Sequence, residues 1–440
     1  MLSDYLILSW LVSPSYALDY SQHLATKSSY FSYHRLQFPT PSADYKLVQI
    51  QLISRHGTRN PSPSDIESFR RLEKISDNIN STSKFSWLKR WKSHYKSNEN
   101  LLLTGIGEKD LYYLGKRARE RYHLISESKY SPLKFSFHSS LASRASQSAS
   151  AFSIGLFEGS GHLTPSNIPA IFYETYSKDE DFILESKGNC PYWGESVKDD
   201  EIKADQLSRY TKSKIQPIAS RISQTIGFKV ETADVRAMYK YCAFDIALQH
   251  RTATWCQFLT PADILDLEYL EDLGYYYKYS YGNAFNGKMA CVLVTKFIEN
   301  IENYSRNKSQ LIGDFQFGHS QTIQFLLTAL GLFKDPFLLT WDLDENLKRN
   351  RMFRTSQVVP FASNIFVELY RYGINAELKV RFLINEAPIK LPNCDMFCPF
   401  KKLKTILKQL LKCDYKHMCQ VKNAKIPSQA RQTYFGNGSR

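Results

Sequence analysis

The chain has 440 residues, of which 43% are hydrophobic, 14% aromatic and 23% charged, and its formal net charge is +14. This composition excludes wholesale disorder, and the length is sufficient for two or three structural units with large cores. The positive charge favours an acidic partner, whether nucleic acid, an anionic membrane or a polyphosphorylated small molecule. Because the basic residues are scattered, with no Lys-rich tail and no zinc-finger spacing, we expect no nucleic-acid partner.

Residues 1–17 have the pattern of a secretory signal peptide. An apolar run over residues 5–12 precedes Ser15 and Ala17. These are small residues at the two positions before the cleavage site that a signal peptidase recognises. Asp4 stands where a positive charge is usual, so the alternative is a buried N-terminal strand. No later run approaches the roughly 20 apolar residues that span a bilayer. We expect a soluble mature protein without stable membrane insertion, secreted or in an endomembrane lumen (endoplasmic reticulum or lysosome-like). The oligomeric state stays open.

Residues 46–53 have the pattern of a strand, and a histidine between two arginines follows them. The guanidinium group of arginine donates two parallel hydrogen bonds to phosphate oxygens and stays charged. A histidine held between two arginines can attack phosphorus. Arg55 and Arg59 are therefore candidate phosphate ligands, and His56 is the candidate nucleophile. Gly57 lets the turn approach an anion closely. The alternative is a loop with two solvated arginines. The strand is expected to point Val48, Ile50 and Leu52 to one face and Leu47 and Ile53 to the other.

The polar, basic stretch over residues 62–100 is expected to form a surface segment that extends over this site. Arg70, Arg71 and Lys74 in this stretch are candidates for binding the distal phosphates of a crowded substrate. A solvated helix face is an equally good interpretation of the same pattern.

The later elements predict an α/β fold with an insertion. A helix is expected over residues 107–126 and a strand over residues 133–138, and the pattern is then helical over residues 154–307. Strands are expected again over residues 311–317, 365–370 and 377–384, the last two joined by a hairpin turn. We predict a large α/β domain with a central, mostly parallel sheet flanked by helices. It comprises residues 18–153 and 308–422, with residues 154–307 as an inserted, mainly helical domain and residues 423–440 as a loose tail.

Two further clusters follow strand ends and suit phosphate binding. His319 comes after an apolar strand end and a glycine, where a second histidine can donate to the transferring phosphoryl group. An ordinary strand-end histidine is the alternative. Arg144 lies between a strand and a helix rich in small residues, and helix N-termini favour anions.

The eight cysteines, an even number, predict disulfides. Cys394, Cys398, Cys413 and Cys419 have a spacing that could in principle bind zinc, but no knuckle glycines accompany them. The signal peptide implies an oxidising compartment, which favours disulfides. Four glycosylation sequons agree with secretion and lie at Asn80, Asn303, Asn307 and Asn437.

These motifs resemble the histidine acid phosphatase superfamily and, within it, the multiple inositol polyphosphate phosphatases, a phytase-like branch. The resemblance implies an α/β domain built from both ends of the chain, an inserted helical domain, no metal or other cofactor, and a bridge between Cys242 and Cys256. It implies that His56 forms a phosphohistidine and that Arg55, Arg59, Arg144 and His319 bind the phosphate; Lys27 joins the substrate-binding candidates. The stretches that carry the resemblance are residues 23–30, 55–61, 103–105, 114–117, 139–148, 238–242, 255–258, 281–283, 317–319, 359–364 and 391–394.

One departure from the family pattern concerns proton transfer. Acid phosphatases have Asp directly after the second histidine, and the inositol polyphosphate branch has Glu two residues after it, where this chain has Ser320 and Gln321. Neither residue can protonate a leaving alkoxide as a carboxylic acid does, and general acid catalysis is worth about 10² to 10⁴-fold. We expect a phosphatase acting on inositol polyphosphates such as phytate. The alternative is a low-activity or inactive relative that binds polyphosphorylated ligands, because Gln321 occupies the catalytic acid's position.

Overall fold

The computed structural model describes residues 18–30, 41–79, 85–163, 165–198, 200–250 and 254–421. Within these residues a seven-stranded sheet has the order β2-β3-β1-β4-β5-β6, and β7 pairs with β5. The expected signal peptide and the expected tail lie outside the described residues. The strands are β1 (Tyr45–Arg55), β2 (Phe135–Ser139), β3 (Gly313–Gly318), β4 (Asn364–Tyr372), β5 (Glu377–Ile384), β6 (Ala387–Ile389) and β7 (Cys398–Pro399).

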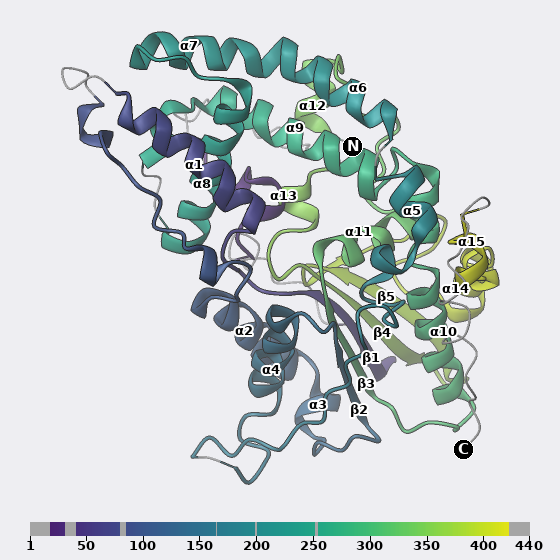
Figure 1. Ribbon diagram of the computed structural model, residues 1–440. Helices are drawn as coiled ribbons and strands as arrows, with labels where there is room; N and C mark the ends of the chain where they lie inside the picture. Colours follow the sequence, from purple (N-terminus) through teal and green to yellow (C-terminus); the bar gives the residue numbers. More distant parts are fainter. Residues whose placement is uncertain are drawn as a thin grey trace, which may run out of the picture.

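The strands β1, β3 and β2 run parallel, so their carboxyl ends lie at the same edge of the sheet (Figure 1). Arg55 at the end of β1 pairs with Gly318 at the end of β3, and Phe317 pairs with Ser139 at the end of β2. β4 and β5 continue the sheet in the antiparallel direction. The predicted α/β fold with a mostly parallel sheet core is confirmed, and this edge is where open α/β sheets bind ligands.

Helices cover both faces of the sheet (Figure 1). They are α2 (Gly105–Arg121), α3 (His123–Ser126), α4 (Ser143–Phe157), α10 (Cys291–Ser305), α11 (Ser320–Ala329), α14 (Phe400–Ile406) and α15 (Tyr415–Met418). On one face Ile50 and Leu52 of β1 pack with α2 and α4. On the other face Ile53 packs with α10, α11 and α14. Each face of β1 therefore serves a separate hydrophobic core.

The predicted faces of β1 are wrong at its beginning. Val48 packs with Ile53 in the layer of α10 and α11, whereas Leu47 packs with Ile50 in the layer of α2 and α4. The pairing with β4 has a register irregularity between Leu47 and Gln49, which explains the exchange. An extra residue in one strand moves the two-residue alternation by one, so the side chains before it change faces.

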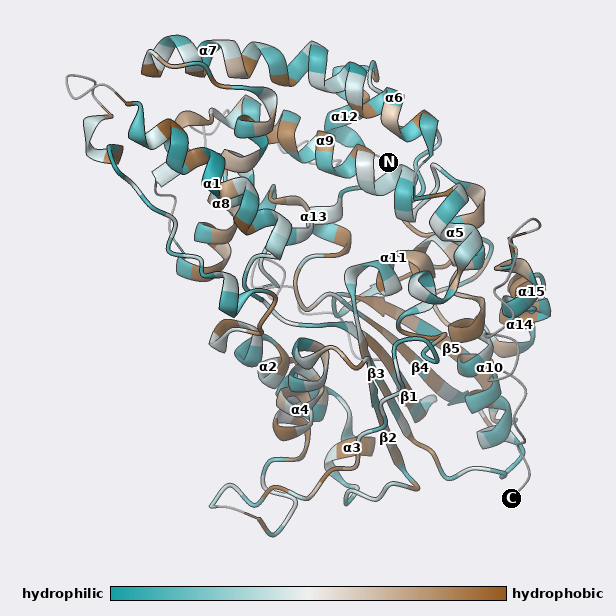
Figure 2. Ribbon diagram, viewed as in Figure 1, coloured by the Kyte–Doolittle hydropathy of each residue, from teal (hydrophilic) through white to brown (hydrophobic). Residues whose placement is uncertain are grey.

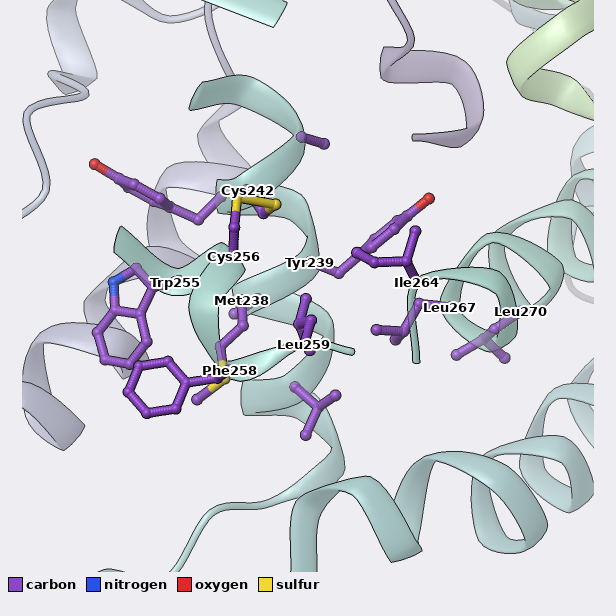
Figure 3. Close-up of a cluster of buried hydrophobic side chains, with 14 of the residues drawn as sticks. Met238, Tyr239, Cys242, Trp255, Cys256, Phe258, Leu259, Ile264, Leu267 and Leu270 are labelled. Atoms are coloured by element: carbon purple, nitrogen blue, oxygen red, sulfur yellow. A yellow bond between two sulfur atoms is a disulfide. The ribbon is translucent and has the colours of Figure 1, made fainter. Parts of the chain in front are cut away.

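The other helices form a separate layer, above the sheet in Figure 1. They are α1 (Pro63–Asp77), α5 (Pro191–Ser196), α6 (Glu201–Tyr210), α7 (Gln216–Ile226), α8 (Thr232–Gln249), α9 (Pro261–Tyr279), α12 (Glu345–Asn350) and α13 (Thr355–Val358). Figure 2 shows hydrophilic and hydrophobic residues interspersed along them, as expected for helices with one buried face. Figure 3 shows part of the core that α1, α7, α8 and α9 share, with Trp255 and Phe258 packed beside Met238 of α8. Trp193 of α5 and Val358 of α13 pack instead in the core of α10 and α11.

The stretch after residue 62 begins as a helix with one buried face. Ile66, Phe69 and Leu72 of α1 lie in the helical core, and α1 packs on α8. The interpretation of this segment as a helix with a solvated face is thus confirmed for residues 63–77. We propose that residues 154–307 supply most of an inserted helical domain, which α1 completes; α10 packs on the sheet instead.

All eight cysteines are paired, which confirms the predicted disulfides. Cys242 pairs with Cys256 inside the helical core (Figure 3), as the family resemblance implied. The zinc alternative is wrong, because the four C-terminal cysteines belong to three different bridges. These bridges are Cys394–Cys398, Cys291–Cys413 and Cys190–Cys419.

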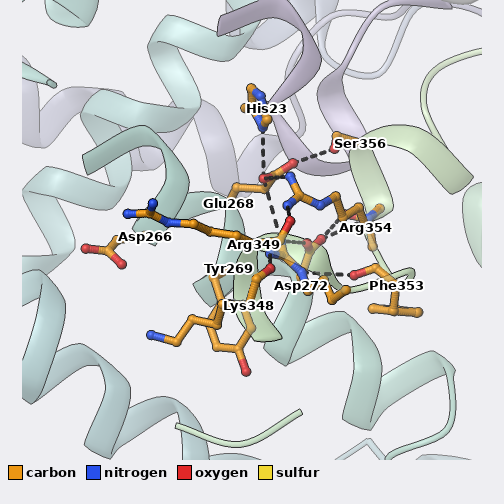
Figure 4. Close-up of polar contacts among 12 residues, drawn as sticks. His23, Asp266, Glu268, Tyr269, Asp272, Lys348, Arg349, Phe353, Arg354 and Ser356 are labelled. Carbon is orange, nitrogen blue, oxygen red and sulfur yellow. Dashed lines mark hydrogen bonds and ion pairs between the residues drawn. The ribbon is translucent and has the colours of Figure 1, made fainter. Parts of the chain in front are cut away.

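A buried polar network joins α9 to the N-terminal segment, to α13 and to the chain just before α13 (Figure 4). His23 Nδ1 lies 3.0 Å from Glu268 Oε2, and the Ser356 hydroxyl donates to the same carboxylate. Arg351 Nη2 lies 3.6 Å from Glu268 and 2.5 Å from Asp272. Because an unpartnered buried charge costs about 3–5 kcal/mol, this network fixes the helical layer against the segment that leads to the sheet edge. Within the described residues, no helix is long and apolar enough to cross a membrane.

Candidate active site

The carboxyl edge of the parallel strands brings two histidines together. His56 directly follows β1, and His319 lies between β3 and α11. Their ring centroids are 5.6 Å apart, and the residues are only 4% and 3% exposed. Two motifs separated by more than 250 residues therefore form one site, because parallel strand ends share an edge.

The His56 ring is held in one tautomer. Its Nδ1 lies 2.8 Å from the carbonyl oxygen of Gly57, which can only accept, so Nδ1 carries the proton. Nε2 then keeps its lone pair and is free to act as a nucleophile. Burial, followed by the nearby charges of Arg55, His319, Arg59 and Arg144, lowers the pKa of His56 well below its ordinary value. The ring is thus neutral, as nucleophilic attack requires.

The loop after β1 is fixed by α2 and α4. The Gly57 N–H donates to Ser148 Oγ at 3.0 Å, and the Thr58 N–H and hydroxyl donate to Asp110 Oδ2 at 3.1 and 2.7 Å. A Cβ atom on Gly57 would lie 2.2 Å from the carbonyl oxygen of Gly107, so only glycine fits this crossing. The close crossing holds the nucleophile rigidly over the sheet edge.

Arg55 and Arg144 present unused donors at this edge. Arg55 Nη1 donates to the carbonyls of Thr26 and Val359, at 2.6 and 2.7 Å, and its guanidinium lies 4.4 Å from the centre of the Phe361 ring. Among the described residues, the Nε atoms of both arginines are buried and have no hydrogen-bond partner. Leaving a buried donor unpaired costs free energy. An anion bound beside the two arginines would accept hydrogen bonds from these unpaired groups.

Arg59 and Lys27 extend the positive charge. Burial, with Arg144 adding to it and Asp65 opposing, lowers the pKa of Arg59 to about 10, which leaves it charged at any working pH. Lys27 is buried, and burial lowers its pKa, with the charges of Asp65 and Glu271 opposing and that of Arg59 adding to the shift. Asp65 is also shared with Lys240, whose Nζ lies 3.3 Å from Asp65 Oδ1. Sequence reasoning missed the role of Lys240, which lies on α8.

His319 has a partner that the sequence did not reveal. Its Nε2 lies 2.7 Å from Glu185 Oε1 and 3.1 Å from Ser140 Oγ, and its Nδ1 lies 3.3 Å from Arg144 Nη2. Glu185 belongs to an irregular segment with no strand or helix pattern, so no sequence signal pointed to it. Gln321, the residue at the expected acid position, is partly exposed on the first turn of α11, and its Oε1 accepts from the Ser320 hydroxyl at 3.2 Å.

The candidate residues of α1 lie apart from this cluster of contacts. Arg71 donates to Asp234 at 2.7 Å and to Glu231 at 2.9 Å, so it joins α1 to the start of α8. Arg70 donates to Glu67 of the same helix at 2.8 Å. Arg70 and Lys74 line an open surface hollow together with Lys92 and Lys96.

The fold and the site define a class of protein: an α/β enzyme with a neutral, buried histidine among arginines at a parallel sheet edge, suited to phosphoryl transfer. The chain belongs to the histidine phosphatase superfamily (branch 2), whose family model matches residues 46–385. The family resemblance inferred from the motifs is therefore confirmed.

Comparison with individual proteins agrees with this family. Multiple inositol polyphosphate phosphatase 1 of Dictyostelium discoideum is 28% identical over 84% of this chain and 67% of its own length. The human protein of the same name is 25% identical over 94% of this chain and 91% of its own length. Among solved structures, the phytase from D. castellii has a TM-score of 0.78 at 19% identity, over 92% of this chain and 88% of its own. The Bifidobacterium longum multiple inositol polyphosphate phosphatase in complex with inositol hexasulfate has a TM-score of 0.72 at 15% identity, over 88% and 97%.

Proposed function

We propose that this protein removes phosphate from inositol polyphosphates such as phytate, through a phosphohistidine intermediate formed on His56. The observation that carries the proposal is the His56 ring itself, whose Nδ1 is held by a carbonyl while Nε2 is left free beside three arginines. The proposal requires no metal and no other cofactor.

The reaction takes place in two steps. In the first, Nε2 of neutral His56 attacks the phosphorus atom while Arg55, Arg59 and Arg144 bind the phosphoryl oxygens, and the leaving oxygen takes a proton. Stabilising the charge on those oxygens is most of the catalytic task in phosphoryl transfer. In the second step, water attacks the phosphohistidine and releases phosphate, and His56 returns to its neutral form.

The choice of a polyphosphorylated substrate rests on charge and on the relatives. The net charge of +14 and the buried Lys27 beside Arg59 favour a ligand with several phosphates. Relatives that cover most of this chain bear the name multiple inositol polyphosphate phosphatase. The alternative, a relative that binds such ligands without turnover, finds no support in the comparisons.

The proposal is tested by incubating the purified protein with phytate between about pH 4 and 7.5 and measuring the release of inorganic phosphate. We expect release that saturates with phytate concentration, because the arginines stay charged and the lowered pKa of His56, caused chiefly by burial, favours its neutral form. A preparation of His56→Ala serves as the blank. Phosphate release no greater than that blank at any pH would contradict the proposal.

We also propose that Arg70 and Lys74 of α1, which line the open surface hollow together with Lys92 and Lys96, bind phosphates distant from the reacting one. Reversing both Arg70 and Lys74 to Glu is expected to raise KM for phytate by about threefold or more, with little change for a monophosphate, because only phytate carries distal charges. The double variant Lys401→Glu/Lys402→Glu, which reverses two exposed charges on α14, is the matched control. Equal changes in KM for both substrates would place α1 away from the ligand.

We place the protein in an oxidising compartment, secreted or in an endomembrane lumen. Four disulfides among the described residues support this location, because such bridges form and persist outside the cytosol. Asn303 and Asn307 are exposed at the end of α10, where they are accessible to glycosylation. Asn80 and Asn437 lie outside the described residues.

A further inference from the structure

We propose that His319, with Glu185 holding its ring, is the proton donor to the leaving oxygen and takes the role of the carboxylic acid that Gln321 lacks. The inference rests on the proposed phosphatase function. It gives His319, so far a phosphate ligand, the further role of proton donor to the leaving oxygen, and it names Glu185 as the residue that positions it. His319 is the catalytic residue in this step, because its ring lies 5.6 Å, centre to centre, from the ring of the nucleophile His56. Glu185 is a positioning residue, because it acts through His319.

The contacts around His319 fix which ring nitrogen faces the substrate. Glu185 Oε1 lies 2.7 Å from Nε2, and a carboxylate oxygen can only accept, so Nε2 carries a proton. Ser140 Oγ, at 3.1 Å, serves as a second acceptor for the same nitrogen. Nδ1 is therefore the nitrogen beside Arg144 Nη2, at 3.3 Å. The centroids of the His319 and His56 rings are 5.6 Å apart. Because Arg144 is a candidate phosphate ligand, we infer that Nδ1 is the nitrogen on the side of the phosphate.

Glu185 is built into this position. The Leu184 carbonyl accepts from the Thr322 hydroxyl at 3.0 Å, which ties the Glu185 segment to the first turn of the helix that begins after His319. The Leu184 N–H donates to Asp181 Oδ1 at 2.8 Å, and Cys190 holds the following turn to Cys419. Glu185 as a whole is only 9% exposed. A fixed, buried acceptor of this kind sets the tautomer of a histidine and strengthens its basicity.

The charges around the pair couple the proton on His319 to substrate binding. In the empty site the pKa of His319 is lowered by burial first and also by Arg144 of α4 and Lys187, although Glu185 opposes them. Burial tends to raise the pKa of Glu185, but the hydrogen bond to His319 and the charges of His319, Lys187 and Lys178 outweigh it, so Glu185 stays ionised. A bound phosphate adds negative charge beside Nδ1 and engages Arg144, so it favours a proton on that nitrogen.

The proton is conserved over the two steps. As His56 Nε2 forms its bond to phosphorus, the bond to the leaving oxygen breaks, and that oxygen takes the proton from His319 Nδ1 and departs as a neutral alcohol. In the second step water forms a bond to phosphorus, gives its proton to Nδ1, and the phosphorus–nitrogen bond electrons return to His56. His319 is then protonated again for the next cycle.

The test compares Glu185→Gln with Glu185→Asp and with Glu180→Gln, an exposed change of the same charge five residues away. We expect Glu185→Gln to lower kcat on phytate by about 100-fold and kcat on an aryl phosphate by less than about fivefold, because an aryl oxide leaves without a proton. Glu185→Asp should recover part of the loss, and Glu180→Gln should match the wild type on both substrates. Equal losses on the two substrates, or no loss on phytate, would overturn the inference.

A second measurement needs no variant at the site. Nitrogen-15 spectra of the histidine rings of the whole protein report the tautomer of His319, with His319→Gln used only to assign its signals. We expect a proton on Nε2 alone without ligand and on both nitrogens when inorganic phosphate is added. A proton on Nδ1 alone, or no change with phosphate, would overturn the inference even if Glu185→Gln fails to fold. Failure of the wild type to release phosphate from either substrate would instead reject the proposed function.

Discussion

Replacing His56 is expected to remove turnover on every phosphomonoester, with kcat falling by at least about 1,000-fold. Without the ring nitrogen there is no covalent intermediate, and the arginines alone only stabilise charge on a phosphate that nothing attacks. The informative replacement is His56→Asn, because its amide N–H can still donate to the Gly57 carbonyl, as Nδ1 does now. The loop after β1 should therefore keep its contacts with Ser148 and Asp110.

The intermediate itself can be measured. Wild-type protein mixed with substrate and quenched in alkali should carry one phosphoryl group by intact mass, and that group should be lost in acid, as expected for a phosphohistidine. His56→Asn should carry none while still binding inorganic phosphate, because Arg55, Arg59 and Arg144 are unchanged. A phosphorylated His56→Asn protein would place the nucleophile elsewhere.

The pH dependence has a definite sign. The pKa of His56 is lowered well below its ordinary value, chiefly by burial, so the nucleophile stays neutral as the pH falls through the range where a free histidine would be protonated. Loss of the nucleophile should begin only at a lower pH. The donor works in the opposite sense, because protonation of His319 becomes less complete as the pH rises. Activity should therefore fall on the alkaline side first.

From the sequence, the site residues at the carboxyl ends of the strands could be predicted, whereas Glu185, which lies outside the strands, could not. Strand ends before His56, Arg144 and His319 were recognisable, and parallel pairing brings such ends together without further information. The bulge near Val48 was not predictable, because a single extra residue changes the faces without changing the apolar content. Glu185 was missed for a different reason: it is placed by a tie between its segment and α11, and no local pattern encodes such a contact.

The helical layer illustrates the same limit. The buried positions Ile66, Phe69 and Leu72 of α1 are three residues apart, yet with the charges around them the sequence could not choose between a helix face and a surface segment. Arg71 is the clearest case, because its guanidinium is committed to Asp234 and Glu231 across the helix pair. A basic residue can be counted from the sequence, but its partner is set by packing.

Replacing Gln321 with Glu is expected to raise kcat on an inositol phosphate by about tenfold or more, and to raise kcat on an aryl phosphate much less. The new side chain has nearly the same shape, and it can accept the hydrogen bond that Ser320 now donates to the Gln321 oxygen at 3.2 Å. It adds a titratable acid two residues after His319. The expected gain in kcat is within the range that general acid catalysis supplies. Because the first turn of a helix favours the ionised form of a carboxyl group, the gain should grow as the pH falls.

Combining Gln321→Glu with Glu185→Gln shows whether His319, held by Glu185, is the native proton donor. If His319 with Glu185 is the donor, Gln321→Glu should give its largest gain in the Glu185→Gln background, where the native donor is weakened, and a smaller gain in the wild type. Adding His56→Asn to Gln321→Glu should abolish turnover, which shows that any gain uses the same covalent route. A wild-type rate that is already high and does not change with Gln321→Glu would mean that Gln321 is not the weak point of this site, and that the native donor is sufficient without a carboxylic acid on α11.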